Sequence, residues 1–169
     1  RTVKEGKTIT QQIHLIREEV HRSDRIITDL MGFAQLAEGS VEPLNIPEEM
    51  DQAVEQVFPE AADFKMKIER DYAPALPKVF MQRGHFNEIM VNILQNAREA
   101  IPENCKIKLT ASAGEDYSIL VTIEDSGPGM SQELLDQVFE PYFTTKEKGT
   151  GLGLAIVRRN VEIYGGHLK

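Results

Sequence analysis

Cysteine, tryptophan and long apolar runs are scarce or missing in this chain. Cys105 is the only cysteine, and there is no tryptophan. A lone cysteine excludes an internal disulfide framework and a multi-cysteine metal site, and it is typical of a reducing compartment. No apolar run approaches the roughly 20 residues that span a bilayer, and the N-terminal sequence RTVKEGKTIT lacks the apolar region of a signal peptide. We therefore expect a cytoplasmic chain without direct membrane contact, although a longer parent protein could carry an anchor elsewhere.

Positive charge is also in deficit, because 19 Lys and Arg residues stand against 27 Asp and Glu, which gives a net charge of -8. The absence of a basic cluster argues against nucleic acid as a partner. The 169 residues suit one domain, or one domain with a helical appendage. We expect that any anion it binds is small and accompanied by a metal ion.

The segment from Lys7 to Glu38 has the spacing of a bundle helix. Its apolar or small residues recur alternately four and three positions apart, and a second apolar stripe lies beside them. A helix of roughly 30 residues is about 45 Å long and cannot cover that face alone. We predict a homodimer through this helix, with packing on its own globular domain as the alternative.

A change of pattern near Ser40 divides the chain into residues 1–39 and a globular domain of residues 40–169. In the second part strand-like segments alternate with helical ones, which predicts an α/β fold of the two-layer sandwich type. The predicted strands are Phe64–Glu69, Cys105–Ser112 and Tyr117–Glu124, the last two forming a hairpin across residues 113–116. The main predicted helices are Pro47–Phe58, Arg83–Ile101 and a last one that begins near Gly153.

The predicted helix Arg83–Ile101 carries a polar stripe opposite its apolar face. The stripe residues follow one another at four, four and three positions: Glu88, Asn92, Asn96 and Glu99. Asparagine is a poor residue for the middle of a helix, so two of them one turn apart suggest a site. An amide oxygen is a suitable Mg²⁺ ligand, whereas the alternative is a solvated helix face.

Two glycine-containing segments follow. In DSGPGM, Asp125 ends a strand, and its carboxylate could accept a hydrogen bond from an exocyclic amine; a plain strand-to-helix turn is the alternative. The segment GTGLGLA fits neither a P-loop nor a dinucleotide fingerprint, since Leu154 stands where a third glycine would be needed. It leads into a helix whose N-terminus would favour phosphate, and Lys146 and Lys148 add positive charge unless they are only solvated.

Together, these motifs resemble the ATP-binding catalytic domain of sensor histidine kinases, which share a superfamily with gyrase, mismatch-repair and heat-shock-chaperone ATPases. NEIMVNILQNAREAI is similar to the N box, EDSGPGM to the first glycine box, VFEPYFTTK to the F box and GTGLGLAIV to the second glycine box. The segment IREEVHRSDRIITDLMGFAQL resembles the second helix of the dimerisation and histidine-phosphotransfer domain. The resemblance covers nearly the whole chain.

The resemblance implies ATP and Mg²⁺ as cofactors and gives the residues roles. Asn96 would ligate Mg²⁺, Asn92 would line the phosphate end, and Glu88 would help to position or polarise a reactant. Asp125 would receive the adenine amino group in a pocket shaped by Gly127 and Gly129. A lid over the triphosphate would comprise Gly149, Thr150, Gly151, Leu152 and Gly153, with Phe139 and Phe143 at its base and Lys146 near the phosphates.

The implied function is transfer of the γ-phosphoryl group of ATP to a histidine of a dimerisation helix, for relay to a response regulator receiver domain. The family's phosphoacceptor box is absent, and His14 and His21 do not match it, so the chain alone is expected to lack its acceptor. It also stops at GGHLK, before the family's usual last strands, as a fragment would. The alternatives are a superfamily ATPase, which would have a glutamate at position 92, a related serine kinase, and an inert nucleotide-binding or dimerisation module.

Overall fold

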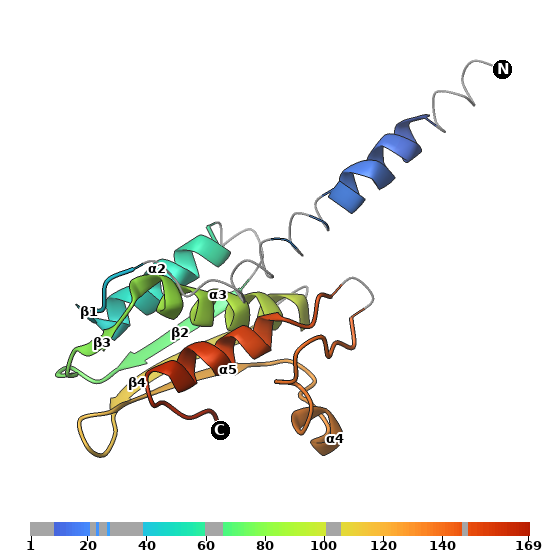
Figure 1. Ribbon diagram of the computed structural model, residues 1–169. Coiled ribbons are helices and arrows are strands. Elements are labelled where there is room, and N and C mark those ends of the chain that lie inside the picture. Colours follow the sequence, from blue (N-terminus) through green and yellow to red (C-terminus); the bar gives the residue numbers. More distant parts are fainter. Residues whose placement is uncertain are drawn as a thin grey trace.

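The computed structural model describes residues 9–20, 23, 27, 39–59, 66–100, 106–146 and 149–169 (Figure 1). Residues 9–20 are helical, and Ile9, Ile13, Ile16 and Val20 on this helix are each more than half exposed. The exposed apolar stripe agrees with the predicted bundle helix, although most of the predicted range beyond residue 20 lies outside the described residues. In the part of the chain that the structure describes, no helix is long and apolar enough to cross a membrane.

Two sheets form the β layer of the domain. β2 (Lys67–Tyr72), β4 (Lys106–Ala113) and β5 (Ile119–Asp125) make a sheet of order β2-β4-β5, in which β2 and β4 are parallel and β4 and β5 antiparallel. β1 (Glu42–Leu44) pairs with β3 (Val79–Met81) in a separate antiparallel ribbon. β4 alternates buried and less buried side chains, as expected for a strand with one face on the core.

Helices cover one face of the three-stranded sheet, which gives the two layers of the predicted α/β sandwich (Figure 1). They are α2 (Ile46–Val57), α3 (Arg83–Ala100) and α5 (Gly153–Ile163), while α4 (Gln132–Leu135) is a single short turn. α2 begins with Pro47 in its first turn and two acidic residues after it, both favourable at a helix N-terminus. Arg83 at the start of α3 pairs with Glu42 of β1 and Glu49 of α2, which ties three elements together.

The core lies between the helices and β4. The residues of α3 that the sequence predicts to be buried are largely so, including Phe86, Ile89, Met90, Leu94 and Ala97. They pack with fully buried residues of the other elements, which are Leu44, Met50, Ile107, Leu109 and Val157. Because the apolar face of α3 packs into this core, the direction in which its polar stripe points is fixed.

The predicted boundaries of β2 and of the β4–β5 hairpin are wrong, and β2 begins at Lys67, after Met66. β2 runs to Tyr72 instead of ending at Glu69, because Arg70 Nε and Tyr72 Oη both donate to Asp51 Oδ1 of α2, at 2.7 and 3.1 Å, and hold the strand beyond Glu69. The hairpin turn comprises residues 115–118 instead of 113–116, since Ser118 N donates to Glu115 O at 3.0 Å and Ala113 still pairs with Ile119. Phe64 and Cys105, at the predicted strand starts, lie outside the described residues.

Candidate functional site

The first half of the α3 polar stripe faces α5. Asn92 Nδ2 donates to the backbone oxygen of Glu88 at 2.9 Å, which turns the amide oxygen of Asn92 away from its own helix. That oxygen lies against Gly153 at the start of α5, where a Cβ atom would be only 2.7 Å from it. The carboxylate of Glu88 accepts a hydrogen bond from Asn160 Nδ2 of α5 at 2.8 Å. Glu88 is therefore bound to a neighbouring helix.

The second half of the stripe binds the ammonium group of Lys146. Lys146 Nζ donates to Asn96 Oδ1 at 2.8 Å and to Glu99 Oε2 at 2.5 Å, although the lysine is 50 positions away from Asn96 in sequence. Lys146 N in turn bonds to Thr144 Oγ1 at 3.1 Å, which fixes the backbone at the start of the glycine loop. Asn96 Oδ1 is thus oriented toward a positive charge. Lys148, the second predicted lysine, lies outside the described residues.

The glycine loop before α5 lies against residues 142 and 143. Tyr142 N donates to Gly151 O at 2.9 Å, and Gly151 has a left-handed φ of 69°. A Cβ atom at Gly151 would lie 2.7 Å from Phe143 O, so the loop approaches this segment as only glycine allows. This places Phe143 at the base of the loop, as the resemblance implies, whereas Phe139 is half-buried four positions earlier in the sequence.

The N-terminus of α5 lies beside Asn92. Leu152 occupies the cap position and is 1% exposed, and it gives the helix no side-chain cap. Thr150 Oγ1 accepts from Leu152 N at 3.4 Å, and the first turn contains no acidic residue. The first amides of a helix carry the positive end of its dipole, so an uncapped helix start beside an amide and a lysine favours an anion.

Asp125 ends β5 in a turn that is tied to β4. Its Oδ1 accepts a hydrogen bond from Gly127 N at 2.7 Å, and Ser126 exchanges two hydrogen bonds of 3.0 Å with Lys106. Gly129, the second predicted glycine of this turn, has a φ of 72°. The Asp125 carboxylate is exposed and held in position by its own loop. Figure 1 shows the end of β5, the glycine loop and the start of α5 at the same end of the domain.

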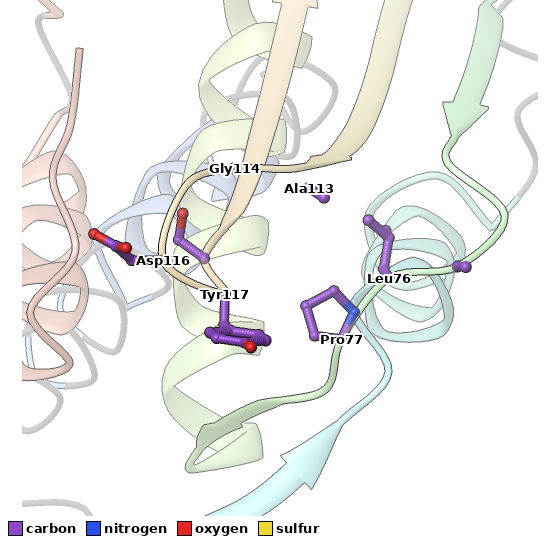
Figure 2. A pocket seen from close by; sticks show the side chains of 8 residues that line it. Leu76, Pro77, Ala113, Gly114, Asp116 and Tyr117 are labelled. Atoms are coloured by element: carbon purple, nitrogen blue, oxygen red, sulfur yellow. The ribbon is translucent and has the colours of Figure 1, made fainter.

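A hollow of about 610 Å³ lies elsewhere, between the β4–β5 hairpin and the connection from β2 to β3 (Figure 2). Leu76 and Pro77 form one wall of the hollow, and residues of the hairpin, including Asp116 and Tyr117, form the other. Tyr117 is 93% exposed, with a φ of 60°. None of the predicted site residues lines this hollow.

The structure therefore sets Asn92 against the start of α5 and joins Lys146 to Asn96, one turn farther along α3. The end of β5, the strand that Asp125 terminates, lies at the same end of the domain (Figure 1). Asn160 is a residue of this region that the sequence pattern does not single out. The one available signal is an asparagine in the middle of α5, three and four residues after the apolar Val157 and Ile156.

Residues 81–169 match the family of histidine kinase-, DNA gyrase B- and HSP90-like ATPases. The chain belongs to this family. It is 28% identical over 155 residues to sporulation kinase D of Bacillus subtilis (strain 168), a match that covers 91% of this chain and 30% of the relative. The chain thus spans about a third of the length of that kinase. The family prediction is confirmed.

Solved structures of histidine kinases share the fold. Full-length ShkA in complex with AMPPNP has a TM-score of 0.76 and 27% identity, and the match covers 90% of this chain and 33% of ShkA. Histidine kinase ThkA in complex with the response regulator protein TrrA also has a TM-score of 0.76, with 25% identity over 94% of this chain and 46% of ThkA. The predicted α/β fold is confirmed, and the chain is a histidine kinase-type ATPase domain of the kind found in two-component sensors.

Proposed function

We propose that this domain binds Mg·ATP between α3, the Asp125 turn and the start of α5, and transfers the γ-phosphoryl group to a histidine of a dimerisation helix. The phosphohistidine would then supply the phosphoryl group to an aspartate of a response regulator. The observation that carries the proposal is that Asn92 lies against the uncapped N-terminus of α5, while Asn96, one turn along α3, is bonded to Lys146. The ShkA complex with AMPPNP and the ThkA complex with a response regulator support it.

The phosphate end of the proposed site fits a magnesium nucleotide. Asn96 Oδ1 already faces a cation, the Lys146 ammonium, so its dipole is oriented as a metal ligand requires. Among the described residues there is no group of three His, Cys, Asp or Glu side chains that could hold a metal ion by itself. A single amide ligand suits Mg²⁺ whose remaining ligands are water and phosphate oxygens. Bound Mg²⁺ would neutralise phosphate charge, and the α5 amides and Lys146 would add to this.

The adenine end is the Asp125 turn. One carboxylate oxygen of Asp125 is fixed by Gly127 N, which aims the exposed group and prepares it to accept a hydrogen bond from the adenine amino group. Gly127 and Gly129 have no side chains to obstruct a flat ring. A hydrogen bond to a charged acceptor contributes about 1.5 to 3 kcal/mol, enough to select adenine.

Phosphoryl transfer to histidine fits the chemistry of these residues better than hydrolysis does. Asn92 stands where the water-using ATPases of the resembled superfamily place a glutamate, and an amide cannot take a proton from water. Glu88, one turn earlier, is bonded to Asn160 of the neighbouring helix. Phosphoryl transfer depends mainly on positioning and charge stabilisation, which this site supplies.

The acceptor histidine is proposed to come from another helix. The His14 side chain is 74% exposed on the helix of residues 9–20, with Nε2 3.8 Å from Glu18 of the same helix, which suits an ordinary surface histidine. His21 lies outside the described residues. We further propose that residues 1–39 belong to a dimerisation domain and residues 40–169 to the catalytic domain, and that the exposed stripe of the helix forms a homodimer.

Titration calorimetry with Mg·ATP tests the site. Wild-type chain should bind, and Asp125→Asn should weaken binding by about 10- to 150-fold, the equivalent of about 1.5 to 3 kcal/mol. Asp116→Asn, the same change in the β4–β5 hairpin, is the matched control and should bind as wild type does. Equal affinities of the folded Asp125→Asn and Asp116→Asn variants would refute the placement of adenine.

A further inference from the structure

Two polar contacts and one close approach of an amide oxygen to a glycine follow one another along the interface of α3 and the segment from Gly153 to Tyr164. His85 Nδ1 lies 2.7 Å from Tyr164 Oη, Asn160 Nδ2 donates to Glu88 Oε2 at 2.8 Å, and Asn92 Oδ1 lies against Gly153. We call these contacts the polar ladder. Positions 85, 88 and 92 of α3 meet positions 164, 160 and 153 in reverse order, so the two helices run antiparallel. The first contact is farthest from the proposed phosphate site, and the last is part of it.

Asn160 provides the most buried donor of the ladder. It is 2% exposed and follows the buried residues Ile156 and Val157 on α5. Burying an amide without a hydrogen-bond partner costs free energy, and asparagine is a poor helix former. A buried asparagine in the middle of α5 is therefore unfavourable unless its amide makes a hydrogen bond. Glu88 supplies that partner from α3.

A buried polar pair specifies the register of two helices more strictly than apolar packing does. Apolar side chains can repack after a small rotation or slide, whereas a buried donor is satisfied only in the register that meets its acceptor. A shift of α5 by one residue would turn its side chains by about 100° and take Asn160 away from Glu88. The Asn160–Glu88 bond therefore selects one orientation of α5.

That orientation decides where the phosphate-binding groups lie. Asn160 is seven residues after Gly153, which is about 10 Å along a rigid helix, so fixing one end fixes the other. We infer that Asn160 is a positioning residue: its bond to Glu88 sets the register of α5 on α3 and thereby places the first amides of α5 beside Asn92 and Asn96. The inference rests on the proposed function, and it gives Glu88 a role in positioning.

The inference is tested by exchanging the amide and the carboxylate between positions 160 and 88, with Mg·AMPPNP as the probe. Asn160→Asp sets two carboxylates against each other and should weaken binding by about tenfold, as expected for residues in direct contact. Glu88→Gln combined with Asn160→Asp restores a donor and an acceptor in reversed positions, and it should recover most of that loss. Gln95→Glu, which adds a carboxylate at an exposed position of α3, is the control and should bind as wild type does.

Rescue by the double variant assigns the loss of binding to the Asn160–Glu88 pair rather than to either substitution alone. Binding is measured at a temperature at which every variant is folded, so that a loss of stability does not count as a loss of affinity. Thermal unfolding of each variant is measured in parallel. If Asn160→Asp does not fold, Asn160→Ala takes its place and must also bind the probe about tenfold more weakly. The inference is wrong if the Asn160 variants bind as tightly as Gln95→Glu, or if the double variant binds no better than Asn160→Asp. A wild-type chain that does not bind Mg·AMPPNP would overturn the proposed function as well.

Discussion

Replacement of Gly151 by alanine tests how closely the glycine loop must approach residues 142 and 143. Gly151 has a φ of 69°, and an L-residue in that region costs about 1 to 2 kcal/mol. The added Cβ atom would also lie 2.4 Å from Tyr142 C and 2.7 Å from Phe143 O, which are backbone atoms that cannot rotate away. Forcing extra volume into a packed site costs about 1 to 3 kcal/mol. We therefore expect a total cost of about 2 to 5 kcal/mol.

Two assays measure this cost, because the substitution can either lower the stability of the domain or force the glycine loop away from residues 142 and 143. Denaturant unfolding reports the first outcome, and Mg·AMPPNP titration reports the second as weaker binding. Gly165→Ala is the matched control, since Gly165 has a φ of 71° at the end of α5 and no heavy atom lies within 4 Å of its added Cβ atom. Gly165→Ala should lose only the free energy that the left-handed backbone conformation costs an L-residue, about 1 to 2 kcal/mol. If Gly151→Ala costs no more than Gly165→Ala in both assays, the argument from close approach is wrong.

The remaining predictions concern stability and assembly. Burial and then the charge of Asp51 raise the pKa of Tyr72 from its ordinary value of 10.0 to about 12, so the unfolded chain releases this proton first. The free energy of unfolding should fall as pH rises from 10 to 12, and less so in Tyr72→Phe, as denaturant titrations at each pH would show. Tyr164→Phe removes the partner of Gln82 N and His85 Nδ1 and should cost about 1 to 3 kcal/mol in thermal unfolding. Deleting residues 1–39 should leave a nucleotide-binding monomer; a wholly monomeric intact chain in sedimentation at high concentration would contradict the dimer.

Much of the fold is predictable because its helices and strands are strongly patterned. The apolar face of α3 follows directly from its sequence spacing, and β4 alternates buried and less buried side chains. β3 is not predicted, since three residues carry too little pattern. The hairpin turn is misplaced by two positions because Asp116 and Tyr117 both adopt left-handed φ values, which sequence normally signals with asparagine or glycine.

Only the part of the candidate site that lies on α3 is predictable from the sequence. The Asn92 and Asn96 pair stands out because two asparagines go against helix propensity on one face. The partners of that stripe cannot be predicted in the same way: Lys146 reaches Asn96 from 50 positions away, and Glu88 meets Asn160 from 72 positions away. Such contacts depend on which helices pack together, and a single sequence does not specify that.

Phosphoryl transfer from γ-labelled ATP is the most direct test of the proposed function. The chain is incubated with Mg²⁺ and labelled ATP, alone and with a fragment that contains an acceptor helix of the resembled family, and the products are tested for acid-labile, base-stable label. We predict label on the histidine of the fragment and none on the chain alone. Stoichiometric label on His14 or His21 of the lone chain, or release of phosphate with no label on the fragment, would contradict transfer to a histidine in trans.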